Sequence, residues 1–202
     1  MSTTQIPVDV DVLRGEIQKT YTEVSAEQDK DFLFPTGRSW ADDLDYPQPE
    51  LSRVPDATVE SFAGVANPFA LGRIPRGLTV LDLGCGAGTD LLIAAQMVGP
   101  EGRVIGVDMT PAMLERAGRS AREMGLDDVD LHESLIESLP LGDASVDVVI
   151  SNGVIDLVPD KAAVFSEIDR VLRPGGRLQV ADVVVHTEVS EDARKRIDLW
   201  TG

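Results

Sequence analysis

Cysteine, histidine and aromatic residues are scarce in this chain. It has one cysteine, Cys85, and two histidines among 202 residues, and aromatic residues make up 4% of it. A single cysteine excludes an internal disulfide framework and a metal site made from several cysteines of one chain. No Ser-His-Asp arrangement or metal-ligand spacing is present, and we interpret His132 and His186 as structural or exposed. We therefore expect no bound metal and find no secure general base.

Positive charge and long apolar runs are also lacking. Lys and Arg number 18 against 35 Asp and Glu, which gives a net charge of −17. A surface this acidic repels phosphate backbones and anionic lipids, so we expect neither nucleic acid nor a membrane as a partner. No apolar run approaches the roughly 18 residues of a spanning helix, and the N-terminus has no signal-peptide pattern. We expect a cytoplasmic protein.

A glycine-rich loop follows the first strongly apolar segment. Residues 78–83 predict a short buried strand, glycines follow at positions 84, 86 and 88, and residues 89–98 predict a helix that is apolar on nearly every face. This pattern is typical of the first βα unit of an α/β fold, a doubly wound, Rossmann-like and mostly parallel sheet. The glycines could merely allow tight packing. A dinucleotide site is disfavoured, because its third glycine would stand about five residues after the first, where this chain has Thr89.

The βα pattern then repeats along the chain. Residues 102–108 predict a second strand that ends in Asp108, and Thr110 and Pro111 predict the start of a helix. Residues 129–133, 146–151 and 178–185 predict three further strands, with a turn at 173–177. A helix after Asp160 has an apolar stripe, and a last helix begins at Ser190. The stripe consists of Val164, Phe165, Ile168, Val171 and Leu172.

Taken together, residues 80–88, 106–108, 147–152 and 172–176 resemble the successive motifs of the class I S-adenosylmethionine (SAM) methyltransferases. The resemblance covers about residues 78–185. It implies SAM as the cofactor and a small molecule as the methyl acceptor.

The resemblance also implies roles for individual residues. Asp82 would lie near the ammonium of the methionine part of SAM, and backbone N–H groups of the loop would meet its carboxylate. Asp108 would accept the ribose hydroxyls and Met109 would lie on the adenine. Position 135 is Leu where many family members have an acid, so recognition of the adenine amine falls to Ile136 or Glu137. The loop residues are Gly84, Cys85, Gly86 and Gly88, and we interpret Cys85 as a small buried filler.

Two residues are candidates for the catalytic step. Asn152 begins the loop that would face the transferred methyl group, so it is a candidate for both catalysis and cofactor binding. Tyr21 lies on a predicted helix over residues 8–28, which is either a packing helix or a lid that brings Tyr21 to the cofactor.

A narrower resemblance connects the chain with the arsenite methyltransferase group. It is carried by residues 107–110, 149–155, 159–161 and 198–200. Members of that group bind trivalent arsenic through cysteine thiolates. This chain has Val65 and Gly153 where that group has cysteines, and it ends at Gly202, where a further cysteine would be expected to follow.

The organisation we expect is a helical N-terminal cap or lid, residues 1–75, and a SAM-binding domain, residues 76–202. Residues 29–75 predict one convincing short helix, at about 56–62, within an aromatic-rich wrap or mobile cap. The C-terminal strands of the family, which complete the sheet order 3-2-1-4-5-7-6, are missing. Either the chain is a shortened one or a natural fragment, or another chain covers the fifth strand, as in a homodimer.

Three functions follow from these observations. The first is a SAM-dependent methyltransferase that acts on a small molecule and is arsenite-methyltransferase-like. The second keeps arsenite as the substrate, with thiols from missing residues or from glutathione. The third is a SAM-binding protein that no longer transfers methyl groups.

Overall fold

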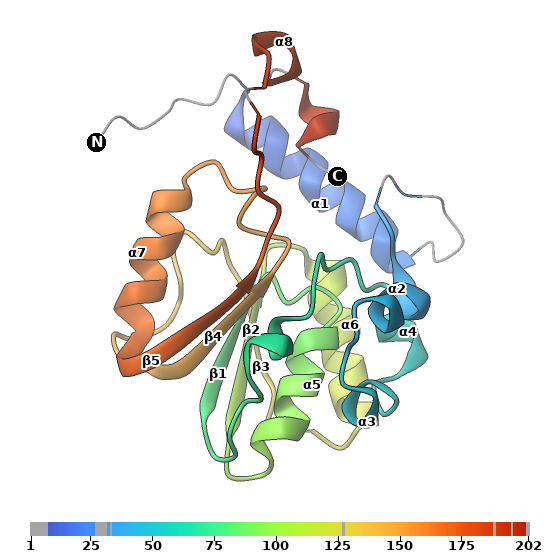
Figure 1. Cartoon of the computed structure of the whole chain (residues 1–202), viewed down its shortest axis with the longest axis vertical. Helices are drawn as coiled ribbons and strands as arrows, with labels where there is room; N and C mark the ends of the chain where they lie inside the picture. The colour runs from blue at the N-terminus through green and yellow to red at the C-terminus, as the bar shows by residue number, and fades with distance from the viewer. Residues whose placement is uncertain are drawn as a thin grey trace.

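The computed structural model describes residues 8–26, 32, 34–126, 128–187, 189–194 and 196–200. Its centre is one sheet of five parallel strands in the order β3-β2-β1-β4-β5 (Figure 1). The strands are β1 (Thr79–Leu83), β2 (Arg103–Asp108), β3 (Asp130–Glu133), β4 (Val146–Asn152) and β5 (Leu172–Ala181). The predicted Rossmann-like fold is confirmed, and all pairs in this sheet are parallel.

Helices cover both faces of the sheet. Helices α5 (Thr89–Val98) and α6 (Pro111–Glu123) lie on one face and α7 (Lys161–Val171) lies on the other (Figure 1). Each face has its own apolar core. Val80 and Val148 point into the core that contains α5, and Leu81 and Val149 point into the core that contains Val164 of α7. Successive strand residues therefore point to opposite faces, and both faces are buried, as expected for central parallel strands.

Helix α1 (Val10–Ala26) lies across the carboxyl end of the sheet and packs against α6 (Figure 1). It corresponds to the helix predicted over residues 8–28, of which residues 27 and 28 lie outside the described part. Leu13, Ile17 and Val24 are buried because their spacings of four and seven residues place them on one face of the helix.

The segment that follows, residues 34–75, is an ordered wrap over α5 and α6. It contains α2 (Gly37–Asp43), α3 (Gln48–Leu51), α4 (Asp56–Val59) and the 3-10 helix η1 (Pro68–Leu71). The helix predicted at about 56–62 is present as α4, which ends at Val59, but the expectation that it is the only helix here was wrong. The rings of Phe62 and Phe69 lie edge-on to Tyr46, and all three are buried, so this wrap has a small aromatic core of its own.

Two predicted details near the C-terminus were wrong. Strand β5 begins at Leu172 and ends at Ala181. Residues 173–176, predicted as a turn before the strand, form an irregularity within the strand. Val183, Val184 and Val185, predicted as strand, are exposed by 53% to 69%. The carboxylate of Asp182 accepts the backbone N–H groups of Ile155 and Val183, so the chain leaves the sheet at this point.

Two helices also differ from their predictions. Phe165, predicted as part of the apolar stripe of α7, is 48% exposed, because Val164, Ile168 and Val171 fill the buried face. The last predicted helix is observed as the short α8 (Glu191–Arg194) and the 3-10 turn η2 (Ile197–Leu199). Among the described residues, no helix combines the length and the apolar character that crossing a bilayer requires.

Candidate functional site

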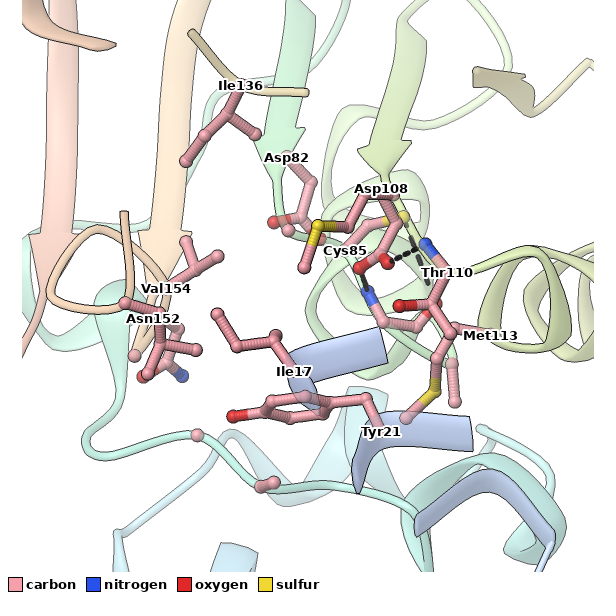
Figure 2. A pocket seen from close by; sticks show the side chains of 18 of the residues that line it. Ile17, Tyr21, Asp82, Cys85, Asp108, Thr110, Met113, Ile136, Asn152 and Val154 are labelled. Carbon is pink, nitrogen blue, oxygen red and sulfur yellow. Dashed lines mark hydrogen bonds between the residues drawn. The ribbon is translucent and has the colours of Figure 1, made fainter. Parts of the chain in front are cut away.

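A pocket opens at the carboxyl ends of β1, β2 and β4, beneath α1 (Figure 2). It encloses about 1020 Å³ of atom-free space, solvent at its mouth included. With the exception of Gly88, the site residues predicted from the sequence line this pocket, although they come from five separate segments. They are Tyr21, Asp82, Gly84, Cys85, Gly86, Asp108, Met109, Ile136, Glu137 and Asn152.

The glycine loop lies open to the pocket at Gly86. Gly86 has a φ of +52°, and a Cβ atom built on it would meet no atom within 4 Å. A side chain here would therefore project into free space and not into protein. Gly88 has a different role. A Cβ atom built on Gly88 would lie 3.0 Å from the Cβ of Ala117, so this glycine lets α5 pack closely on α6.

Asp108, at the end of β2, holds the glycine loop in place. One carboxylate oxygen accepts the Gly86 N–H at 2.9 Å and the other accepts the Thr110 N–H at 2.8 Å (Figure 2). Thr110 begins α6 as predicted, but its side chain does not cap the helix. Burial raises the pKa of Asp108, and these hydrogen bonds oppose that effect. Each carboxylate oxygen can accept a second hydrogen bond, so Asp108 can also bind a ligand.

Two more carboxyl groups lie at the bottom of the pocket. Asp82 of β1 is 3% exposed and Asp90 of α5 is 7% exposed. Burial raises the pKa of both groups, and the neighbouring charge of Asp90 raises that of Asp82 further. Asp90 was not among the site residues predicted from the sequence. Its signal was weak but present: it is a charged residue in the first turn of a helix that is otherwise almost entirely apolar.

Asn152, at the end of β4, connects the sheet to the wrap. Its side-chain oxygen accepts the N–H groups of Val65 and Ala66 at 2.8 and 3.3 Å. Its side-chain nitrogen, which has two N–H donors, lies within hydrogen-bond distance of three acceptors: the Ala66 carbonyl at 2.8 Å, the Tyr46 hydroxyl at 2.9 Å and the carboxylate of Asp90 at 3.0 Å. Protein groups thus occupy the polar atoms of this side chain, which lies at the edge of the pocket.

Helix α1 closes the pocket through polar contacts that the sequence analysis also missed. The guanidinium of Arg14 lies 3.0 Å from the carboxylate of Glu137, and the Gln18 side chain donates to the Met109 carbonyl at 2.7 Å. Tyr21 projects into the pocket from the same helix (Figure 2). Burial, followed by the charge of Asp156, raises the pKa of its hydroxyl, so Tyr21 stays protonated at neutral pH.

The thiol of Cys85 and the two histidines offer no reactive group to this site. Cys85 is 6% exposed, and burial raises the pKa of its thiol, so the side chain is a buried thiol and not a reactive thiolate. Val65 and Gly153 are neighbours, since a Cβ atom built on Gly153 would lie 3.1 Å from Val65. His132 pairs with Asp130 on β3, and His186 is exposed. No cluster of three potential metal ligands occurs in the part of the chain that the structure describes.

Comparison with known proteins agrees with this architecture. A family model described as a methyltransferase domain matches residues 74–201. An arsenite methyltransferase of Halobacterium salinarum is 42% identical over 167 residues, which are 83% of this chain and 42% of that protein. The chain therefore spans less than half the length of this relative.

Solved structures give the same assignment. An arsenic(III) S-adenosylmethionine methyltransferase from Chlamydomonas reinhardtii is 43% identical, with a TM-score of 0.64 over 72% of this chain and 51% of the other. A SAM-dependent methyltransferase from Aquifex aeolicus is 25% identical, with a TM-score of 0.54 over 77% and 79% of the two chains. This chain belongs to the methyltransferase domain family, in its class I SAM-dependent branch, and its cofactor is S-adenosylmethionine.

Proposed function

We propose that this chain transfers the methyl group of SAM to a small organic acceptor in the pocket beneath α1. The observation that carries this proposal is the glycine loop. It leaves β1, is held by Asp108 at the end of β2, and presents open space at Gly86 where a ligand backbone can approach.

The residues present fit the cofactor. The unpartnered carboxylate oxygen of Asp82 suits the ammonium of the methionine part, and the open loop at Gly86 suits its carboxylate. In this assignment Asp108 accepts the ribose hydroxyls and Met109 lies on the adenine. Ile136 offers a backbone contact to the adenine amine, because the carboxylate of Glu137 is already paired with Arg14.

The chain's own residues would act by alignment. SAM supplies an electrophilic methyl group, so an acceptor that is already nucleophilic needs mainly orientation and exclusion of water. Tyr21, as a neutral phenol, can donate a hydrogen bond to the acceptor but cannot serve as a base at neutral pH. Asn152 would fix the wall of the pocket, since its amide is bound to the wrap.

The acceptor side of the pocket is apolar. Ile17, Val154, Leu157 and Val158 line it beside Tyr21. Such a wall favours a small organic molecule with an apolar body. We further propose that residues 1–75 form the cap of this site and residues 76–202 the SAM-binding domain, because α1 and the wrap meet the sheet at the pocket.

Arsenite is the second candidate acceptor, because longer relatives, of which the match covers less than half, carry the name arsenite methyltransferase. The structure gives a reason to rank it lower. Val65 and Gly153, which stand where that group has cysteines, are neighbours here but carry no sulfur, and the thiol of Cys85 is buried. Binding of trivalent arsenic by thiolates would need sulfur from glutathione or from residues outside this chain.

Calorimetry with SAM and its demethylated product tests the cofactor assignment first. A methyl-release assay then compares arsenite, with and without glutathione, against a panel of phenols, quinones and amines. We expect SAM binding and turnover with at least one organic acceptor. Turnover restricted to arsenite plus glutathione would favour the second candidate, and SAM binding without turnover by any acceptor would indicate a protein that binds SAM but does not transfer methyl groups.

A further inference from the structure

Two buried carboxyl groups in the pocket each have an oxygen without a partner. Oδ2 of Asp82 and Oδ1 of Asp90 are buried and make no hydrogen bond to any described residue. Both residues line the pocket, and both are more than nine-tenths buried. A buried carboxylate oxygen without a partner costs free energy unless a proton or a ligand compensates for it. The pair therefore indicates a place where a positively charged group binds.

Asp90 is held in a fixed orientation by the wrap and by β4. Its Oδ2 atom accepts the Asn152 side-chain N–H at 3.0 Å, and the Tyr46 hydroxyl hydrogen-bonds to the same carboxyl. Asn152 in turn is anchored to Val65 and Ala66. One oxygen of Asp90 is thus used for positioning, and the other, Oδ1, is buried without a hydrogen-bond partner among the described residues.

Among the described residues, no basic side chain contributes to the charge around this pair. The titratable groups that face it are Asp108 from β2, Tyr46 from the wrap and Cys85 from the loop. Arg14 is the one basic side chain among the pocket-lining residues, and it is paired with Glu137. Burial, opposed in part by the hydrogen bonds from Tyr46 and Asn152, raises the pKa of Asp90 to about 6. Burial and the charge of Asp90 raise the pKa of Asp82 well above its usual range. The empty pair therefore holds a proton up to a higher pH than an exposed carboxyl group does.

We propose that Asp90 joins Asp82 in a two-carboxylate site for the ammonium group of the cofactor's methionine part. An ammonium group has three N–H donors and can satisfy both free oxygens at once. Its positive charge favours the ionised form of both acids, so binding lowers their pKa values and favours release of a proton. This assignment rests on the proposed function and adds Asp90, which carries no assigned role in the sequence motif.

The test compares two ligands on two proteins. S-adenosylhomocysteine carries the ammonium, whereas 5′-methylthioadenosine has the same nucleoside without the amino-acid part. Calorimetry should show that Asp90→Asn weakens S-adenosylhomocysteine binding by about 10- to 100-fold, as expected for loss of a charged hydrogen-bond acceptor. The variant should bind 5′-methylthioadenosine as the wild type does.

The outcomes separate this inference from the proposed function. An equal loss for both ligands would show that Asp90 only supports the fold, and unchanged binding of both would show that Asp82 acts alone; either result overturns the inference. A wild-type protein that binds neither ligand would overturn the proposed function, and this inference with it. Circular dichroism of the variant checks that it is folded.

Proton release gives a second measurement that a purely structural role would not change. Titrations at pH 6 to 7 in buffers of different ionisation enthalpy count the protons released per ligand. Wild type should release a fraction of a proton with S-adenosylhomocysteine and none with 5′-methylthioadenosine. Asp156→Asn is the matched control, because Asp156 also has a raised pKa but does not line the pocket. Asp156→Asn should release as many protons as wild type when S-adenosylhomocysteine binds, and Asp90→Asn should release fewer. Equal release from Asp90→Asn and wild type would overturn the inference.

Discussion

The two sides of the pocket are built by different means. On the sheet side, the glycine loop and the end of β2 are joined by hydrogen bonds between backbone N–H groups and Asp108, within some 25 residues of sequence. On the cap side, α1 contacts the site through the side chains of Arg14 and Gln18, and the wrap is bound by the side chain of Asn152 from β4. These contacts join residues that are 86 to 123 positions apart in the sequence. The geometry of the sheet side is therefore fixed by segments that are close in sequence, whereas the position of the cap side depends on a few side-chain contacts between distant segments.

The largest effect is expected where the sheet side is blocked. Gly86→Val would place a branched side chain in the open space of the loop and should abolish SAM binding, a loss of more than about 100-fold in affinity. Calorimetry measures it. Gly125→Val is the matched control, because Gly125 also has a positive φ and open surroundings but lies away from the pocket. The control should be strained to a similar degree and still bind SAM. Normal binding by Gly86→Val would remove the loop from the cofactor site.

The next effect tests the residue that joins the loop to β2. Asp108→Ala removes the acceptor of the Gly86 and Thr110 N–H groups and the expected acceptor of the ribose hydroxyls. We expect SAM binding to weaken by about 1–3 kcal/mol. Calorimetry on the folded variant checks this value, and an unchanged affinity would show that Asp108 only holds the loop.

A pH effect is expected at the loop between β4 and α7, which carries the apolar acceptor wall. Burial, then the hydrogen bond and charge of Asp182, raise the pKa of Asp156 to about 7. Between an unfolded pKa near 3.8 and this value, the native state binds more protons than the unfolded state, so stability falls as the pH rises through that window.

Asp156→Asn should remove this part of the pH dependence. Its amide can still donate to Asp182, as the protonated acid does, so the variant should gain about 1 kcal/mol relative to wild type at pH 8 and nothing near pH 4. This gain is smaller than the full pKa shift would give, because the carboxyl group of Asp156 is partly exposed to solvent. Denaturant unfolding at both pH values measures it. If the free energies of unfolding of the two proteins differed by the same amount at all pH values, a raised pKa of Asp156 would be contradicted.

The smallest effect is expected on the cap side. Arg14→Gln removes the ion pair with Glu137 but leaves the buried contacts of Leu13 and Ile17, so SAM affinity should fall by only about two- to fivefold. Lys19→Gln is the control on the same helix, because its pair with Glu16 is exposed and remote from the pocket. A loss as large as that of Asp108→Ala would show that the cap side is as strictly required as the sheet side.

Much of this site could be predicted because its signals are local. The strand at residues 79–83, the three glycines and the helix at 89–98 follow one another directly in the sequence. Neighbouring residues therefore determine which of them are buried and where the chain reverses. Asp108 could be placed for the same reason, since it ends a strand whose parallel neighbour is β1, and parallel strands bring their carboxyl ends to one edge.

Other features had no such signal. Helices α2 and α3 of the wrap have seven and four residues, fewer than two turns, so periodicity cannot reveal them. Phe165 fits an apolar stripe by spacing, but the face of α7 that is buried depends on where the sheet lies. The run at 183–185 has strand composition, yet the carboxylate of Asp182 bonds to the β4–α7 loop and the chain turns away.

The sequence by itself determined the alternation of strands and helices around the sheet, the parallel sheet and the glycine-rich loop, because hydrophobic periodicity and glycine spacing act over a few residues. Only the tertiary structure decided which polar groups meet in the pocket. Asp90, Asn152 and Tyr46 come from three distant segments and were brought together by packing of the wrap on α5 and β4. Their hydrogen bonds depend on three-dimensional distance, which a pattern along the chain does not encode.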